Sequence, residues 1–495
     1  MKHRMLLLLS KIWGFVGILL VIIIATLIIF WARGYEINFT TGNVVDTGIL
    51  RINSTPTNAK IYLNNTYEGL SPLIINSLIP GTYKVEVATS NYSIWNGLVS
   101  VQSQQITNLN SFLLPTNVKQ SILSVPGEIY YSTFSKDSNM LFIVSKRKNN
   151  NYDLYYMNLN NNTLNYPLKP IFITNLSNYS RSAISSIKIT SNSNFSDLTF
   201  DINGIYYLYS VSNSTITPMN TFLSSLAIQN IKWANDSTLI LENNNLLATL
   251  DISTGQIIVI AVNSNNKSMI PYDLYNGNIV YAITQNINNS LYSTLIYTSN
   301  LDGTNKILLT SIQGNAQNLI VDNSNKFLGI TSSLGNYIFN VKSNKLYQID
   351  NGVKMIKFSP NSNYLLLEHG NILEEYYLAN KQYIILNSNL KNLYNIMWYP
   401  IGGYIFYEGT NKSINQTTAI NNKSVSNSTS NNGYSLFSET ESSTVVTNLV
   451  KNTDGTYYVS TNGNYLVVET QGINKIKAIY IINLIQNTSI FPFSL

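Results

Sequence analysis

A short phrase recurs along residues 118–495 of this 495-residue chain and limits the folds open to it. Each copy is a short strand, a turn of Ser, Asn, Asp or Pro, and then a strongly apolar strand. The clearest copy runs from Ile356 to Leu367 and reads Ile-Lys-Phe-Ser-Pro-Asn-Ser-Asn-Tyr-Leu-Leu-Leu. Self-similarity of this kind is typical of an array of small structural units. Eight copies begin near these residues: Thr133, Ile187, Ile231, Tyr272, Leu319, Ile356, Ile396 and Leu449.

The spacing of the copies predicts the architecture of the array. They lie roughly 37 to 55 residues apart, which fits one four-stranded blade per copy. With turns such as Phe358-Ser359-Pro360-Asn361, the array resembles the β-propellers with FSPDG-type turns, such as the WD40-like and TolB-like repeats. The resemblance implies an all-β fold over 118–495 with seven or eight blades, because the spacing is irregular and the ring can close across its ends. Two stacked β-sandwiches are the alternative, and they leave the period unexplained.

Residues 48–115 form a separate and smaller segment. Short alternating strands are expected at 49–52, 60–63, 83–87 and 97–101. Turn residues separate them, including Asn64-Asn65 and Pro80-Gly81, at the spacing of a small antiparallel β-domain.

An ordered set of motifs in this segment resembles the PEGA domain. The motifs are Ser54-Thr55-Pro56-x-x-Ala59, Ile61-Tyr62-Leu63-Asn64, Gly69-Leu70-Ser71-Pro72, Leu78-x-Pro80-Gly81-Thr82-Tyr83-x-Val85 and Asn91-Tyr92-x-x-Trp95. Asn65 stands where the family usually has Gly, and we expect the turn to persist because Asn tolerates the left-handed conformation. The resemblance implies a small extracytoplasmic, non-catalytic β-sandwich that acts as a spacer or binds at cell surfaces.

The N-terminus carries a run of 21 residues without a charge, Ile12 to Ala32. As a helix, at about 1.5 Å per residue, this run spans a hydrocarbon core of ~30 Å. Three basic residues precede it and Arg33 alone closely follows it, which predicts a cytoplasmic N-terminus. A cleaved signal peptide is the alternative, but its apolar region is shorter and ends in a small-residue site. We therefore expect a single-pass protein of the cell membrane with its bulk extracytoplasmic: tail 1–11, transmembrane helix 12–32 and linker 33–47.

Composition excludes several classes of function. Cysteine is absent, which rules out disulfides, thiolate metal sites and cysteine nucleophiles. The formal net charge of +6 is thinly spread, so no nucleic-acid partner is expected.

The search for chemistry yields no catalytic, cofactor-binding or metal-binding residue, and no cofactor is expected. A Ser-His-Asp triad would have to use His369, but no Gly-x-Ser-x-Gly motif accompanies it, so we expect His369 at a strand end or turn. The turns Asp302-Gly303 and Asp454-Gly455 lack the spaced acids of a calcium loop. A carboxylate pair at the propeller mouth remains open, because such a pair needs proximity only in space.

Two further features have alternative interpretations. Residues 409–433 are almost all Asn, Ser, Thr and Lys, which predicts a disordered insertion in the propeller. Tyrosine pairs are either strand residues with one face buried or an aromatic platform for sugars. The pairs are Tyr130-Tyr131, Tyr206-Tyr207, Tyr376-Tyr377 and Tyr457-Tyr458.

Together these features predict a membrane-anchored, non-catalytic binding or scaffolding protein of the cell envelope. Its propeller would present one rigid face to an envelope glycan or a surface protein. The alternative is an extracytoplasmic glycan-processing lyase or hydrolase with its site at the propeller mouth. Acids, or Tyr with Arg, around the channel would favour the enzyme, whereas Asn, Ser and aromatic residues would favour binding.

Overall fold

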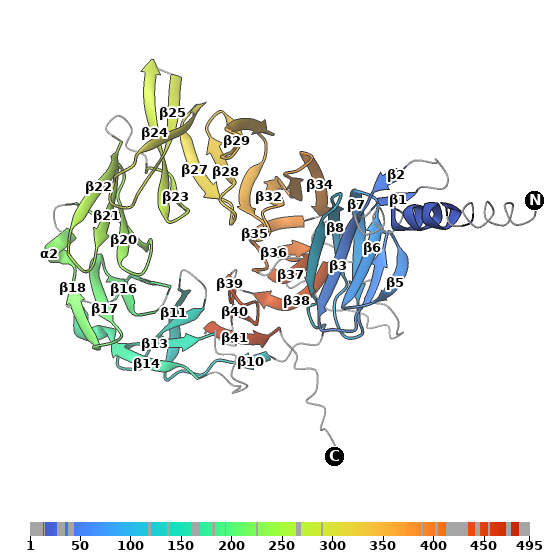
Figure 1. Cartoon of the computed structure of the whole chain (residues 1–495). Helices are drawn as coiled ribbons and strands as arrows, with labels where there is room; N and C mark the ends of the chain where they lie inside the picture. Colours follow the sequence, from blue (N-terminus) through green and yellow to red (C-terminus); the bar gives the residue numbers. More distant parts are fainter. Residues whose placement is uncertain are drawn as a thin grey trace, which may run out of the picture. The chain divides into compact units, whose positions relative to one another are not determined.

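Strands make up nearly all of the regular structure in this computed structural model (Figure 1). Two units form, Met1–Thr116 with Thr440–Ser443, and Asn117–Glu439 with Thr444–Leu495. The structure describes residues 13, 15–26, 35–37, 44–116, 120–135, 139–159, 169–180, 184–193, 195–223, 226–263, 269–288, 291–387, 390–400, 404–411, 434–440, 446–453, 456–471 and 477–484.

The N-terminal segment is helical at the residues described there, Trp13 and 15–26. The rest of the predicted transmembrane helix 12–32 and the predicted tail 1–11 lie outside the described residues. Across the described part of the chain, no helix has the length and apolar character needed to cross a membrane. The predicted linker 33–47 instead contains a two-stranded antiparallel sheet, β1 (Tyr35–Ile37) and β2 (Val44–Asp46). Its β-branched and aromatic residues suit strands, a signal that the linker prediction overlooked.

The segment after β2 is a sandwich of two sheets. It contains all four predicted strands and three more. Leu50 and Ile52 on one sheet and Ile61, Val85 and Val87 on the other are fully buried, because alternate residues of each strand point inward. One sheet has the order β6 (Leu73–Leu78), β3 (Gly48–Thr55), β9 (Ile106–Phe112); the other has β5 (Thr66–Leu70), β4 (Lys60–Leu63), β7 (Gly81–Ala88), β8 (Trp95–Val101).

The turn at Asn64-Asn65 confirms the expectation for that hairpin. Both residues are left-handed, with φ of 48° and 69°. Asn64 also accepts the backbone N–H of Lys84 through Oδ1 at 2.9 Å, so its side chain holds the hairpin to β7.

The second unit is built from four-stranded antiparallel sheets, eight of them within the described residues. We number them 1 to 8 along the chain. Sheet 1 contains β11 (Glu128–Phe134), β12 (Met140–Lys146), β13 (Tyr152–Asn158) and β14 (Ile171–Asn175), and sheet 2 contains β15 (Ile187–Ser191), β16 (Asp197–Ile202), β17 (Ile205–Ser210) and β18 (Thr215–Pro218). Sheet 3 contains β19 (Asn230–Trp233), β20 (Thr238–Glu242), β21 (Leu246–Asp251) and β22 (Ile257–Val262). Sheet 4 contains β23 (Tyr272–Tyr275), β24 (Asn278–Asn288), β25 (Leu291–Ser299) and β26 (Ile307–Gln313).

Sheets 5 to 8 complete the array, and short helical turns η1 (Leu176–Tyr179) and α2 (Asn220–Leu223) lie between earlier sheets. The four sheets are β27 (Ala316–Val321), β28 (Phe327–Ser332), β29 (Gly335–Asn340), β30 (Lys345–Ile349); β31 (Lys354–Phe358), β32 (Tyr364–His369), β33 (Ile372–Tyr377), β34 (Gln382–Asn387); β35 (Leu390–Trp398), β36 (Tyr404–Asn411), β37 (Tyr434–Thr440), β38 (Val446–Thr453); and β39 (Thr456–Val459), β40 (Tyr465–Gln471), β41 (Lys477–Asn483) with β10 (Gln120–Ile122).

The sheets follow one another as the blades of a propeller (Figure 1). The first strand of a sheet contacts the first strand of the next, as in β11 with β15 and β27 with β31. Sheet 8 closes the ring, because β10 from the start of the unit pairs antiparallel with β41 from its end. Eight four-stranded sheets within the described residues correspond to the higher of the two predicted blade counts.

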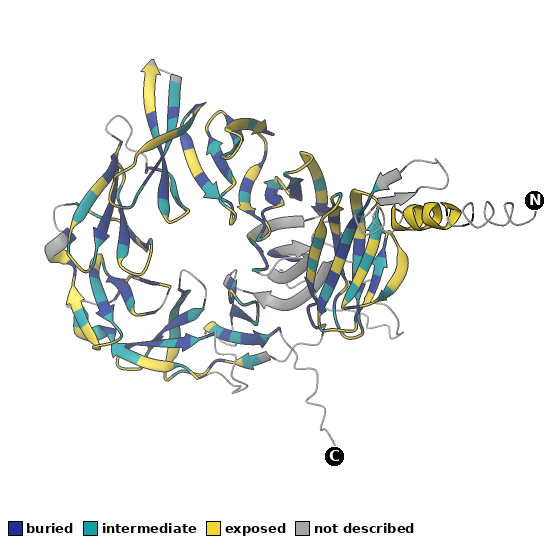
Figure 2. Ribbon diagram, viewed as in Figure 1, coloured by how far each residue is buried: buried dark blue, intermediate teal, exposed yellow. Residues whose placement is uncertain are grey.

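The second strand of each blade explains the apolar part of the repeated phrase. In β12, Phe142 and Val144 pack with residues of sheet 2, whereas Leu141 and Ile143 pack with residues of sheet 8. A neighbouring sheet therefore covers each face, and all four of these side chains are fully buried. Figure 2 shows buried residues along many strands of the propeller sheets.

The turn residues of the phrase have a repeated structural role. Ser359 Oγ accepts the backbone N–H of Tyr364 at 2.9 Å, and Ser460 does the same for Tyr465 at 3.0 Å. Asp322 Oδ1 takes this place in sheet 5, where it accepts from Phe327 at 2.6 Å. The polar residue thus caps the turn between the first and second strands.

The first residues of the insertion predicted at about 409–433 lie in a strand. Strand β36 continues to Asn411, which lies opposite Leu390 of β35. Pairing with the neighbouring strand thus extends β36 beyond its apolar residues. Residues 412–433 lie outside the described residues, and β37 begins at Tyr434.

Candidate functional site

One end of the propeller carries the turns from second to third strands and the connections between sheets. We call it the loop end. Its turns are rich in Asn, whose amides bind the incoming connections. Asn203 Oδ1 accepts the N–H groups of Ser185 at 2.8 Å and Ser186 at 3.2 Å, and Asn243 Nδ2 donates to the carbonyl oxygen of Leu226 at 2.7 Å.

Five second strands carry an acid at the same place, the fifth residue of the strand, near the loop end. We call this set the fifth-position carboxylates. Four of them are buried and Glu368 is partly exposed. The sequence interpretation missed them, although the signal was visible: in five copies of the phrase the apolar strand leads into an acid. They are Asp201 in β16, Glu242 in β20, Glu368 in β32, Glu408 in β36 and Glu469 in β40.

Glu242 joins two neighbouring blades. It accepts hydrogen bonds from Asn230 Nδ2 at 3.1 Å and from the hydroxyl of Tyr272, the first residue of sheet 4. Lys232 Nζ lies 3.2 Å from the carboxylate and 5.0 Å from the centre of the Tyr272 ring. Burial, reinforced by the charge of Glu242, holds the pKa of the Tyr272 phenol far above its usual value. The phenol is therefore a fixed donor to Glu242.

The remaining fifth-position carboxylates also contact neighbouring side chains. Glu469 accepts from Ser132 of sheet 1, and Lys477 Nζ lies 3.6 Å from it. Asn395 Nδ2 donates to Glu408 at 3.2 Å.

Glu368 and Asp201 also lie beside lysines of their own sheets. Lys354 Nζ is 3.0 Å from Glu368. Burial raises the pKa of Asp201, although Lys188 and an N–H bond from Gly204 at 2.6 Å oppose this shift.

The described residues do not assemble a metal centre. Within them, no group of three or more His, Asp or Glu side chains is arranged to hold a metal ion. Asp302 Oδ1 accepts the N–H of Thr304 at 2.9 Å, and hydrogen bonding to Thr304 lowers the pKa of that carboxyl. Its role is to stabilise the turn at Gly303. The other Asp-Gly turn, at Asp454, lies outside the described residues.

His369 and the tyrosine pairs lie in strands. His369 is the last residue of β32, opposite Ile372, which confirms the expected strand end. All four tyrosine pairs lie within strands, in β11, β17, β33 and β39. In every pair, burial raises the pKa of at least one phenol, and for Tyr206 it rises to about 12. Burial therefore favours the protonated form of these phenols over the phenolate that a general base requires.

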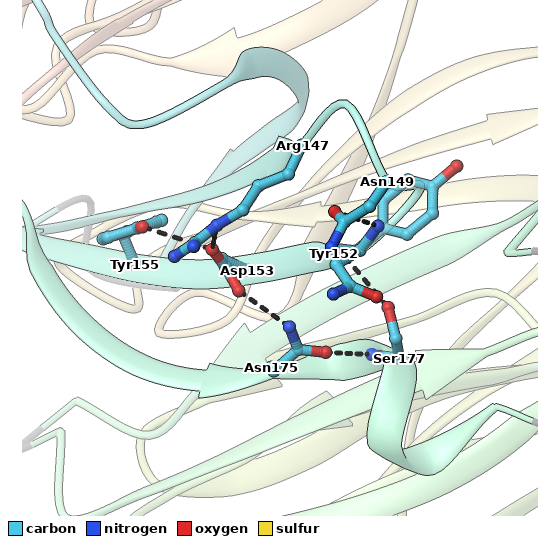
Figure 3. Close-up of polar contacts among 8 residues, drawn as sticks. Arg147, Asn149, Tyr152, Asp153, Tyr155, Asn175 and Ser177 are labelled. Atoms are coloured by element: carbon cyan, nitrogen blue, oxygen red, sulfur yellow. Dashed lines mark hydrogen bonds and ion pairs between the residues drawn. The ribbon is translucent and has the colours of Figure 1, made fainter.

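An arginine at the loop end of sheet 1 is held by a buried acid (Figure 3). Arg147 lies in the turn after β12, and its Nε forms an ion pair with Asp153 of β13. Asp153 is 1% exposed and also accepts from Asn175 Nδ2 at 2.9 Å. Asn175 in turn accepts the N–H of Ser177 at 2.9 Å. These contacts connect the side chain of Arg147 to β13 and β14.

Comparison with known proteins agrees with this architecture. The model of the PEGA domain matches residues 47–117. No curated protein matches the chain.

Solved structures resemble the chain in fold alone. TolB from Acinetobacter baumannii is 13% identical, with a TM-score of 0.31 over 61% of this chain and 80% of that chain. Hsv2p from Kluyveromyces lactis is 10% identical, with a TM-score of 0.35 over 58% and 94%. The tricorn protease is 7% identical, with a TM-score of 0.32 over 82% and 45%. Residues 47–117 therefore match the PEGA domain, and the four-stranded sheets that follow them are arranged as the blades of a β-propeller.

Proposed function

We propose that this protein is a membrane-anchored component of the cell envelope whose propeller binds a glycan or a protein at its loop end without catalysing a reaction. One observation carries the proposal: fifth-position carboxylates near that end hold neighbouring strands and blades together. Glu242 is the clearest case, with contacts to Asn230, Lys232 and Tyr272. The loop end therefore presents the amide side chains of its Asn-rich turns to a partner from a rigid propeller scaffold.

The same observation weighs against the glycan-processing alternative. A glycosidase needs two carboxyl groups about 5–10 Å apart on either side of the scissile bond. Four of the fifth-position carboxylates are buried among side chains of their own or neighbouring sheets. The raised phenol pKa values oppose a tyrosine base for a lyase.

Exposure of the N-terminal helix supports the membrane anchor. Every large apolar side chain described there is exposed, from 44% at Val16 to 73% at Trp13. The hydroxyl of Thr26 donates to the carbonyl oxygen of Ile22 at 2.7 Å, which satisfies the polar group within the helix. A helix that is apolar all round gains free energy by entering lipid.

Alkaline extraction of membranes tests the anchor. The chain should stay in the pellet, and protease added outside intact cells should digest both the PEGA domain and the propeller. Release by alkali, or protection of the β-units, would count against this topology.

Co-sedimentation with purified wall sacculi of the host tests the binding role. The full chain, in detergent, is compared with a chain that ends at Thr116 and lacks the propeller. Saturable pelleting that needs the propeller is the expected result. If neither chain pellets, the glycan partner is wrong, and crosslinking on intact cells should then identify a surface protein. Consumption of wall glycan during the incubation would instead point to the enzyme.

A further inference from the structure

The turn after β12 is internally rigid. The backbone N–H of Arg147 donates to the carbonyl oxygen of Asn151 at 2.8 Å, and the N–H of Asn150 donates to that of Arg147 at 3.0 Å. Asn150 adopts the left-handed conformation, with φ of 58°, which closes the turn. The side chains on this turn are thus presented from a fixed backbone, which lowers the entropic cost of binding a ligand.

The guanidinium of Arg147 is held by two residues of β13, because Asp153 and Tyr155 both hydrogen-bond with it. Nε pairs with the buried carboxylate of Asp153, and the arginine side chain is 50% exposed (Figure 3). A guanidinium has a second edge, made by its two terminal nitrogens, that matches the two oxygens of a carboxylate. In this arrangement Asp153 and Tyr155 are the positioning residues, and the exposed part of the guanidinium is the part that a ligand can reach.

The turn after β12 is also more basic than the corresponding turns described in other sheets. Lys146, Arg147 and Lys148 are consecutive, and Glu128, opposite Lys146, and Asp153 offset only two of the three charges. The second-to-third turns that the structure describes in full in other sheets carry no Lys or Arg. They are Asn203-Gly204, Asn243-Asn244-Asn245, Ser333-Leu334 and Gly370-Asn371.

The surface chemistry of this turn suits a polysaccharide better than a folded protein. Asn149, Asn150 and Asn151 follow the three cations, and residues 146–151 include no apolar side chain. Interfaces between proteins have an apolar core with aromatic residues and few charges. Sugars present hydroxyls that hydrogen-bond with amides, and uronic acids add a carboxylate.

We infer that residues 146–151 bind an acidic polysaccharide, with the exposed part of the Arg147 guanidinium binding a uronate carboxylate. This inference rests on the proposed function and names its ligand class and contact residue. Lys148 adds long-range attraction, and the three asparagines hydrogen-bond to hydroxyls. Asp153 and Tyr155 fix the orientation of the arginine.

Binding of the full chain, in detergent, to sodium alginate tests the inference. R147A should lower the affinity at least about tenfold, because a charge-assisted hydrogen bond is lost. R147K keeps the charge and the partner for Asp153 but not the fork, and should also bind more weakly. K326A, at an exposed lysine in a turn at the opposite end of the propeller, is the matched control and should bind like the unaltered chain.

Each outcome decides the matter. Equal binding by R147A, R147K and the unaltered chain would overturn the site. Preference for poly-L-glutamate over alginate would overturn the polysaccharide assignment, and equal binding of neutral dextran would overturn the anionic one. If R147A pellets with sacculi as well as the unaltered chain does, this site is wrong while the proposed function stands. If alginate binding needs Arg147 but sacculi bind nothing, the site stands and the wall role fails.

Discussion

Leu123 donates its backbone N–H to the carbonyl oxygen of Ile479 at 2.8 Å, which joins the beginning and the end of the propeller in one sheet. The neighbouring Ser121 hydroxyl reaches the carbonyl oxygen of Ile481 at 3.4 Å, across 360 residues of sequence. A ring of blades has no open edge strands between its first and last sheets only if this seam holds. The three residues of β10 therefore matter to the whole propeller.

The seam predicts that two adjacent proline substitutions differ in their effect on stability, with the larger loss for L123P. L123P removes the N–H that donates to Ile479 and shortens a buried side chain, and should cost at least about 2 kcal/mol of unfolding free energy. I122P changes an exposed residue whose N–H, by the alternation of an antiparallel ladder, points away from β41. Urea unfolding followed by tryptophan fluorescence compares them. Equal midpoints would show that the seam does not limit propeller stability.

The fifth-position carboxylates predict a contrast between two equivalent sites. E242A leaves the hydroxyl of the half-buried Tyr272 without its acceptor and should cost about 2–4 kcal/mol. E368A removes a pair whose lysine side chain is 75% exposed, and should cost less than about 1 kcal/mol. The same urea experiment measures both. A larger loss for E368A than for E242A would contradict the blade-to-blade role of Glu242.

Asp201 predicts a pH-dependent effect in which ionisation of a fifth-position carboxylate lowers the stability of the folded protein. Burial raises its pKa in the folded state, so between the unfolded and folded pKa values the folded protein holds more protons than the unfolded one. Its contribution to stability consequently falls as the pH rises through that interval. D201N removes the titration while its Oδ1 can still accept the N–H of Gly204.

The measurement for D201N is the urea midpoint at pH 7 and pH 4. The variant should be more stable than the unaltered chain at pH 7, and the difference should shrink at pH 4, where Asp201 is increasingly protonated. A difference that grows on acidification would mean that the ionised carboxylate is stabilising in the folded state.

The parts of the fold that were predictable from sequence depend on local interactions. The turn from Ser359 to Tyr364 is closed by a hydrogen bond within five residues, and the apolar strand follows immediately. Each copy therefore carries its own signal. The Asn64-Asn65 hairpin was predictable for the same reason, since left-handed turns favour Asn.

Other features depend on partners that are remote in sequence. The strand Gln120–Ile122 has three residues and no distinctive pattern, and only its pairing with β41 defines it. The sequence alone shows Glu242 at the end of an apolar strand, but the role of this residue depends on Tyr272 in the next blade. Arg147 and Asp153 are close in sequence, yet the third member of that network, Asn175, comes from the outermost strand of the sheet. Patterning within one strand does not report such contacts.

The pair of Arg147 and Asp153 supports a final prediction, by a double-mutant cycle. R147A leaves a carboxylate that is 1% exposed without its cation and should lower the urea midpoint of unfolding. R147A with D153N removes the buried charge too, and the amide oxygen introduced by D153N can still accept from Asn175. We expect the double variant to recover much of the lost stability without regaining affinity for alginate, because stability needs charge balance whereas binding needs the guanidinium. Recovery of both properties would assign the pair a purely structural role, and recovery of neither would mean that Asp153 is ionised and well solvated without Arg147.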